Sequence, residues 1–404
     1  MKSIELRPAA KISGKKSWGK AVGGILSIAL LASAQHATAG AEFKLGDEAG
    51  VTVGFGLRTS FSTTEKGAAN ASSNSNDFNV DNARLFFSGH YGKVLKATIN
   101  TDYNSVTDSL TILDAYVGFE FSDYFNIWLG RFLPPQDRAN GYGPFYSLAW
   151  SYPIYASNYP MRENGRDNGA AVWGKLFNGK LVWSGGVFEG HNKYNGSGTP
   201  PITAAAATDK LAFSGRLAFH AWDPEPAPAY LTGGWYGGSK DILTFGLGGY
   251  YQNDGVGPAT APGNLNIWNA DVLFEKKFSA GVPTLEGAYY RYRVGALDCG
   301  AGAACAPNTD PVQNLNVPQA DGKAYMAGAA WLFPQKVGWG QFQPYYRYQK
   351  FSAEAGAAGD IKAQDFGVNY LIKGPNAKIA AQYTKTETVA TDLWKFVLGV
   401  QLMY

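Results

Sequence analysis

The sequence of 404 residues has few of the side chains on which most enzymes and metal proteins depend. It contains two cysteines, Cys299 and Cys305, and four histidines. It has no G-x-S-x-G, no H-E-x-x-H, no phosphate-binding loop and no zinc-ligand spacing. The C-x-x-C-H motif that attaches c-type haem is also missing. The sequence therefore predicts neither an enzyme nor a bound cofactor or metal ion.

Long apolar runs are equally scarce, because no segment after residue 39 is long and apolar enough for a membrane helix. The one apolar run, residues 21–34, is short for a bilayer span. A basic segment precedes it, and Ala37-Thr38-Ala39 follows it. This order predicts a secretory signal peptide, residues 1–39, cleaved between Ala39 and Gly40, with a membrane anchor as the weaker alternative.

A strong charge of either sign is absent as well. The whole chain has 35 Lys and Arg against 32 Asp and Glu. Residues 1–39 hold six of those basic residues and one of the acids, which leaves 29 basic and 31 acidic residues in 40–404. A net charge of −2 gives no support to nucleic-acid binding.

What the chain does have is alternation, seen most clearly in residues 394–404. Trp394, Phe396, Leu398, Val400 and the aromatic Tyr404 fall on one parity. The other parity carries more polar residues, including a lysine and a glutamine. Because successive side chains of a strand point to opposite faces, one face is apolar throughout. This pattern is typical of a strand with lipid on one side and a watery lumen on the other.

Comparable segments recur along the chain and predict an all-β transmembrane antiparallel barrel of residues 40–404. The expected strands lie near 50–62, 78–90, 93–102, 111–121, 125–133, 168–177, 180–189, 209–222, 240–252, 264–278, 282–295, 322–333, 339–352, 361–372, 376–387 and 392–404. Short and long connections alternate between them, as periplasmic turns and external loops do. The long connection 223–238 breaks this rhythm, so counts of fourteen and eighteen stay open beside sixteen, as does a soluble β protein.

Parity also sorts the charged residues. In a barrel a charge on the lipid face costs about 2–4 kcal/mol near the midplane, so charges are expected inside. The predicted pore-lining residues are Arg84, Lys96, Asp114, Glu120, Arg216, Asp271, Arg291, Arg293 and Arg347. Leu113, Tyr290 and Tyr292 are expected to face lipid. Arg131 shares the outer parity, which places it at the membrane interface or beyond a bulge.

The connection 134–167 is long and rich in aromatic residues, which a solvated loop does not need. We therefore expect it to fold into the barrel and narrow the pore. Its constriction residues would be Arg138, Tyr146, Trp150, Arg162 and Arg166. The alternatives are a loop that caps the outer rim or makes a subunit contact.

Cys299 and Cys305 lie together in another long loop. In an oxidising compartment this pair is expected to form a disulfide bond that orders the loop locally.

Two segments resemble the phosphate-selective porin O and P family. They are Asp114-Ala-Tyr-Val-Gly-Phe119 with Trp128-Leu-Gly-Arg-Phe-Leu-Pro-Pro135, and Asn82-Ala-Arg-Leu-Phe-Phe-Ser-Gly89. The resemblance implies a sixteen-stranded porin, often a homotrimer, with a long third loop in the channel and phosphate bound on arginines and lysines. A terminal strand ending in Tyr404 resembles the assembly signal of outer-membrane barrels. The chain departs from the family in its net negative charge.

Together these features predict a porin in the outer membrane of a Gram-negative bacterium. Its partners would be the lipid bilayer and small ions or hydrophilic solutes, including anions as one option. These ions and solutes would cross the membrane by passive diffusion through the pore. The alternative is a barrel that sheathes a multihaem cytochrome and so forms part of an electron conduit.

Overall fold

The computed structural model describes residues 40–104, 109–157, 165–190, 210–226, 229–256, 263–294, 321–354, 360–389 and 391–404. The chain divides into two units, Met1–Ala34 and Gln35–Tyr404, and the description concerns the second. Ala39, Arg162, Cys299 and Cys305 lie outside the described residues. The cleavage site, one loop arginine and the disulfide bond therefore stay predictions.

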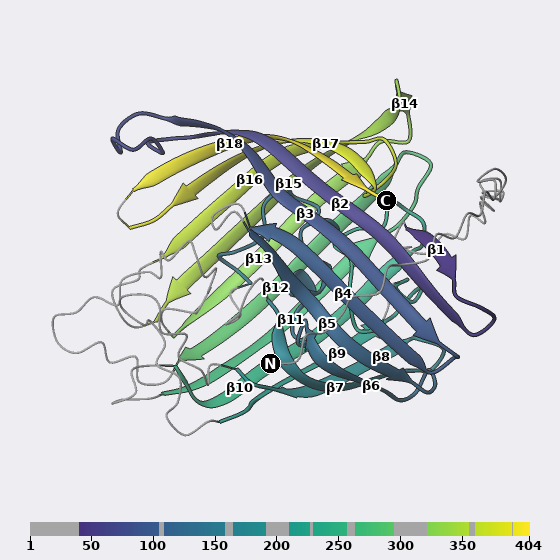
Figure 1. The fold of residues 1–404 in the computed structure, drawn as a ribbon. Helices are drawn as coiled ribbons and strands as arrows, with labels where there is room; N and C mark the ends of the chain where they lie inside the picture. Colours follow the sequence, from purple (N-terminus) through teal and green to yellow (C-terminus); the bar gives the residue numbers. More distant parts are fainter. Residues whose placement is uncertain are drawn as a thin grey trace, which may run out of the picture. The chain divides into compact units, whose positions relative to one another are not determined.

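Sixteen antiparallel strands form a closed ring, in which the last strand, β18, pairs with the first, β2 (Figure 1). The strands are β2 (Ala49–Thr64), β3 (Ser75–Tyr91), β4 (Leu95–Asn104), β5 (Ser109–Glu120), β6 (Asn126–Phe132), β7 (Asp167–Leu176), β8 (Leu181–Phe188), β9 (Ala212–His220), β10 (Ile242–Val256), β11 (Gly263–Glu275), β12 (Val282–Val294), β13 (Gly322–Leu332), β15 (Gly340–Ala353), β16 (Ile361–Leu371), β17 (Ala377–Glu387) and β18 (Asp392–Met403). Two short strands, β1 (Ala41–Lys44) and β14 (Lys336–Val337), pair at the ring's margin with β2 and β15. The predicted barrel of sixteen strands is confirmed.

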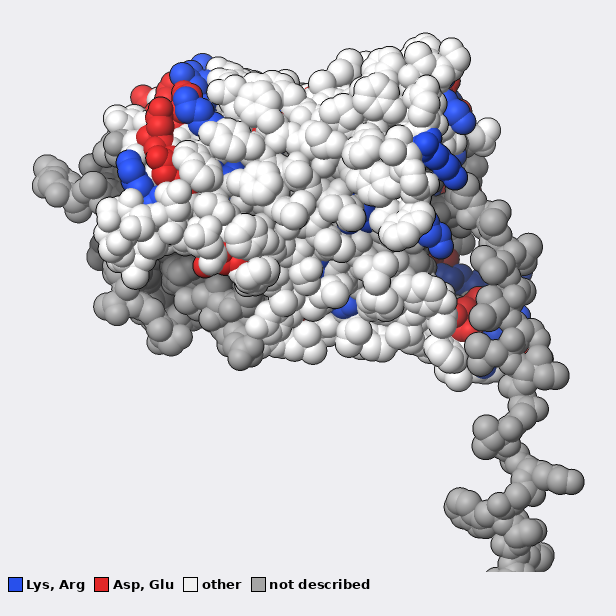
Figure 2. Space-filling model, turned by 90° about the horizontal axis from the view of Figure 1, so that it is seen from above, with Lys and Arg blue, Asp and Glu red and all other residues white. Residues whose placement is uncertain are grey.

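Side chains alternate between the two faces of the wall as the sequence predicts. In β18, Leu398 and Val400 are exposed on the outer face, whereas Gln401 is 1% exposed on the inner face. One side of the wall carries almost no Lys, Arg, Asp or Glu across its middle, and charges gather toward its two ends (Figure 2). An apolar belt between charged rims is the surface that a bilayer requires.

Short turns join the strands at one end of the barrel, with one exception. The connection 221–241 between β9 and β10 is long, although the strand count is sixteen. The rhythm breaks here because the turn is extended and not because a strand pair is missing.

Two expected orientations are wrong in the structure. Leu113 is completely buried, because the β4–β5 register shifts opposite it and turns both Leu113 and Asp114 inward. The carbonyl oxygen of Leu113 accepts a hydrogen bond of 3.1 Å from Nε of Arg131, a residue on the outer parity of β6. The bulge therefore lies beside the arginine that the sequence pattern could not place.

The second wrong orientation is that of β12, whose inner and outer faces are the reverse of those predicted. Tyr290 and Tyr292 are fully buried inside the barrel, so Arg291 and Arg293 lie on the outer parity and do not line the interior. These arginines occupy the last residues of β12, and Arg291 pairs there with Glu354. Charge is tolerated at this end of a strand because water reaches it, whereas the tyrosine rings pack inside.

Among the described residues, no helix is long and apolar enough to cross a membrane. The helix α1 (Arg138–Tyr142) is a single short turn, capped by the side chain of Asp137, which accepts from the backbone N–H of Asn140.

Candidate functional site in the barrel interior

The connection that follows β6 folds into the barrel, and we call its described residues 133–157 the inner loop. It begins against β9, where Oγ of Ser214 donates to the carbonyl oxygen of Pro135 at 2.6 Å. Beside it, Nη1 of Arg216 donates to the carbonyl oxygen of Gln136 at 3.2 Å.

The inner loop then reaches the opposite wall, formed by β16, β17, β18 and β2. There each strand donates one side-chain hydrogen bond to a carbonyl oxygen of the loop. The bonds run from Asn369 to Leu148 (2.9 Å), from Lys378 to Ser147 (3.3 Å), from Gln401 to Phe145 (3.0 Å) and from Arg58 to Trp150 (2.6 Å). Because buried carbonyl groups need partners, these bonds allow irregular backbone to cross the interior.

Inward-facing glycines make room for the inner loop, among them Gly248 and Gly399. A Cβ atom on Gly248 would lie 2.0 Å from the carbonyl oxygen of Gln136. A Cβ atom on Gly399 would lie 2.5 Å from the Trp150 ring. Both distances are too short for any side chain, so the wall and the loop meet here only because these residues are glycines.

The described residues of the long connection between β9 and β10, 221–226 and 229–241, also fold inward, and we call them the inward turn. Its Glu225 accepts two hydrogen bonds from Arg138 of the inner loop, at 2.6 and 2.9 Å. Burial by itself would raise the pKa of the Glu225 carboxyl group, but the Arg138 guanidinium outweighs it and lowers this pKa to about 2. The pair is therefore ionised although both side chains are almost fully buried.

Most of the predicted interior charges are buried in pairs. Arg216 is bound to Asp271 at 2.6 and 2.8 Å, and Arg347 is bound to Asp365 at 2.8 Å. These side chains lie on the inner face, as expected, but beneath the inner loop, so they support that loop and do not face water. Arg84 on β3 pairs with Asp102 on β4, and Arg166, directly before β7, pairs with Asp114 on β5.

Polar side chains on β3, β4 and β5 have a different environment. They point inward but are only half-buried, so water inside the barrel reaches them. They are His90, Lys96, Thr98, Asn100 and Glu120, which we call the passage face. Of the predicted pore-lining residues, Lys96 and Glu120 belong to this face.

Aromatic side chains fill the side of the interior formed by β6 to β13. The buried rings of Trp128, Phe132, Trp173, Phe188, Tyr230, Tyr290 and Tyr292 form one cluster. The sequence pattern does not reveal this cluster, because an inward-facing aromatic residue looks like a lipid-facing one until the inner and outer faces of its strand are known. The passage face borders this packed core, since Nε1 of Trp128 donates to the carboxylate of Glu120 at 3.3 Å.

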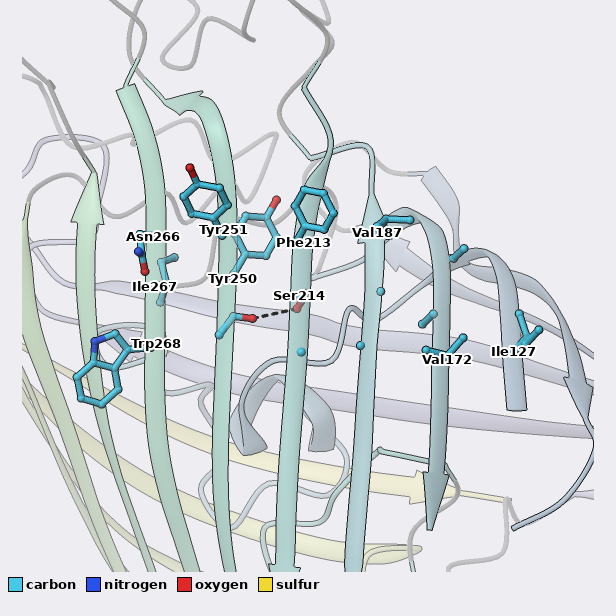
Figure 3. Close-up of a pocket in the computed structure, with 16 residues that line it drawn as sticks. Ile127, Val172, Val187, Phe213, Ser214, Tyr250, Tyr251, Asn266, Ile267 and Trp268 are labelled. Atoms are coloured by element: carbon cyan, nitrogen blue, oxygen red, sulfur yellow. Dashed lines mark hydrogen bonds between the residues drawn. The ribbon is translucent and has the colours of Figure 1, made fainter. Parts of the chain in front are cut away.

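The described part of the chain shows no candidate metal site. It has no cluster of three His, Cys, Asp or Glu side chains that could hold a metal ion. A groove across β6 to β11 lies on the outer wall, where Phe213, Tyr251 and Trp268 flank Gly215 and Gly249 (Figure 3). Because it is apolar and faces outward, it is part of the lipid-facing surface.

Comparison with known proteins agrees with this geometry. Residues 51–229 match the sequence profile of the family phosphate-selective porin O and P. Over these residues, just under half of its length, the chain is similar to outer-membrane porins. It resembles that family in the segments that carry β2 to β9 and the inner loop. A search of curated proteins finds no match.

Solved structures show that the chain shares its fold with outer-membrane proteins of low sequence identity. An anion-selective porin from Comamonas acidovorans aligns over 88% of this chain and 100% of its own, with 13% identity and a TM-score of 0.57. Salmonella typhi OmpF in complex with daunomycin aligns over 90% and 100%, with 15% identity and a TM-score of 0.56. A trimer form of Vibrio cholerae OmpT aligns over 89% and 100%, with 12% identity and a TM-score of 0.54.

Proposed function

We propose that this protein is a channel through which ions and small hydrophilic solutes diffuse passively along the passage face. The observation that carries the proposal is the inner loop, which is bound to the wall on both sides and leaves the polar side chains of the passage face half-buried. A loop held in this way narrows the channel to a fixed cross-section.

The charges on the passage face favour weak ion selectivity. Lys96 and Glu120 have opposite sign, and the nearby arginines Arg84 and Arg166 are neutralised by Asp102 and Asp114. The resemblance implies phosphate bound on arginines and lysines, whereas the arginines nearest the passage face are already paired with aspartates. We therefore propose a general diffusion channel in which any preference for anions is slight.

The assembly that we propose is a homotrimer in the lipid bilayer, with no enzymatic activity. The trimer form of the OmpT structure supports this arrangement by similarity of fold. A cytochrome sheath has no comparable support, because residues of the chain itself occupy the interior that a cytochrome would need.

The test is the single-channel conductance of purified protein in a planar bilayer, with a salt gradient across it. Stable steps with a small zero-current potential are expected. If millimolar phosphate blocks the conductance, the proposal of a general diffusion channel would be replaced by that of a phosphate-selective channel. A folded and inserted barrel without conductance would overturn the proposal.

A further inference from the structure

The inward turn is an insertion that the barrel wall does not need. At its ends, the backbone N–H of Asp223 donates to the carbonyl oxygen of Asp241 at 3.0 Å, and Ala221 pairs likewise with Leu243. The ladder between β9 and β10 is thus complete at these residues, and a two-residue hairpin could join them. Seventeen residues, 224–240, lie between them instead.

These residues pack against the inner loop from the side of the short turns. Oγ1 of Thr232 donates to the carbonyl oxygen of Arg138 at 2.9 Å, and Nη1 of Arg138 donates to that of Gly233 at 2.8 Å. The backbone N–H of Gly234 donates to the carbonyl oxygen of Tyr146 at 3.1 Å. The inward turn therefore contacts the inner loop at both Arg138, where α1 begins, and Tyr146, beyond the end of α1.

The inward turn is fixed to the wall as well. The carboxylate of Glu275 on β11 accepts from the backbone N–H groups of Tyr236 and Gly238 at 2.9 and 2.7 Å. The indole ring of Trp235 is buried among Leu148 of the inner loop and Val282 of β12. Tyr230 belongs to the aromatic cluster and donates to the carbonyl oxygen of Leu133 at 2.8 Å.

One buried ion pair joins the two inserted segments. Arg138 reaches the centre of the barrel from the end with long loops, and Glu225 reaches it from the end with short turns. The hydroxyl group of Tyr236 donates to the same carboxylate. Breaking such a pair leaves an uncompensated buried charge, so each segment depends on the other for its position.

We infer that the inward turn is a second constriction element, which closes the β9–β12 side of the lumen and confines solutes to the passage face. The inference rests on the proposed channel function. The width of the channel is then set by two segments together, the inner loop and the inward turn, which are joined through Arg138 and Glu225.

The first experiment replaces residues 224–240 by Asn-Gly and compares single-channel conductance with that of the native protein. Both proteins are checked for the folded barrel by their heat-dependent mobility on gels. An increase of about twofold or more is expected, because a larger cross-section opens. Equal steps from both proteins would overturn the inference alone. No steps from either inserted protein would overturn the channel proposal, and this inference with it.

Glu225→Gln tests the junction without shortening the chain. Larger or noisier steps are expected, because the amide cannot neutralise Arg138. Asp241→Asn is the matched control. Asp241 belongs to the same connection as Glu225, but its exposed ion pair is with Lys276 of the β11–β12 turn and touches no part of the inner loop. Native conductance in Glu225→Gln, or the same change in both variants, would contradict the role of the junction.

A cysteine pair distinguishes a fixed element from a moving one. A Cβ atom on Gly141 would lie 3.8 Å from Cβ of Thr232, a spacing that suits a disulfide bond. Gly141→Cys combined with Thr232→Cys should conduct equally when oxidised and when reduced. Loss of conductance on oxidation would show that the inward turn must move, and would overturn a fixed constriction.

Discussion

The guanidinium group of Arg58 lies 3.9 Å from the centre of the Trp150 ring, and its Nη2 atom donates to the carbonyl oxygen of the same residue. One side chain of the wall thus holds both the ring and the backbone of the inner loop. A planar guanidinium can do both at once, whereas an ammonium group cannot.

Arg58→Lys should therefore loosen the inner loop while keeping the charge. We expect a loss of about 1–2 kcal/mol, the usual size of a desolvated cation–π contact with its hydrogen bond. Thermal unfolding followed by gel mobility measures it, and conductance noise should increase. Lys93→Arg in an exposed turn is the control. Unchanged stability and noise in Arg58→Lys would contradict this role.

Gly248→Ala should displace the start of the inner loop, since its methyl group would overlap the carbonyl oxygen of Gln136. The neighbouring Gly249→Ala is a matched control, because there the nearest atom would be 3.4 Å away. We expect altered conductance and lower thermal stability for the first variant only. Equal behaviour of the two variants would show that the loop does not approach the wall here.

Lys96→Glu should shift the channel toward cations, because Lys96 is the one lysine of the passage face. The zero-current potential in a salt gradient measures this shift. Lys93→Glu makes the same charge change in the turn between β3 and β4 and should shift the potential less. If the two shifts are equal, solutes do not pass along β4.

Leu247→Arg tests which face of the wall meets lipid. Leu247 is 58% exposed on the outer face of β10, so in water this change would cost little. In a bilayer we expect a cost of about 2–4 kcal/mol and a lower yield of folded barrel. Leu45→Arg, at an exposed residue beside β1, should be tolerated. Full yield of the β10 variant would contradict a lipid-facing wall.

The ion pair of Glu225 predicts a pH dependence of the inward turn. The pKa of its carboxyl group is lowered from 4.5 to about 2, so the stabilisation is complete above pH 4.5 and is lost as the pH falls through about 2. The hydrogen-exchange protection factors of residues 229–238, which are corrected for the intrinsic pH dependence of exchange, should therefore fall between these pH values and stay constant from pH 7 to 5. Glu225→Gln should remove this step. A step that persists in the variant would belong to another group.

The alternation in the sequence was sufficient to predict the wall of this protein. Lipid on one side and water on the other impose a period of two on every strand, so Leu398, Val400 and Gln401 could be placed without a structure. The pattern fails where other forces act. Leu113 lies in a bulge, and the tyrosines of β12 face a core that no periodicity reveals.

The arrangement of segments inside the barrel depends on the tertiary structure and could not be predicted from the sequence. The aromatic content of 134–167 predicted a loop inside the barrel, but its position depends on side chains from β2, β9 and β16 to β18, which meet only when the ring closes. Glycines 248 and 399 admit the loop, and nothing in their sequence neighbourhood distinguishes them from other glycines. Arg138 and Glu225 are 87 residues apart and approach from opposite ends. Local sequence encodes a strand's faces, whereas a contact inside a closed ring depends on the register of all sixteen strands.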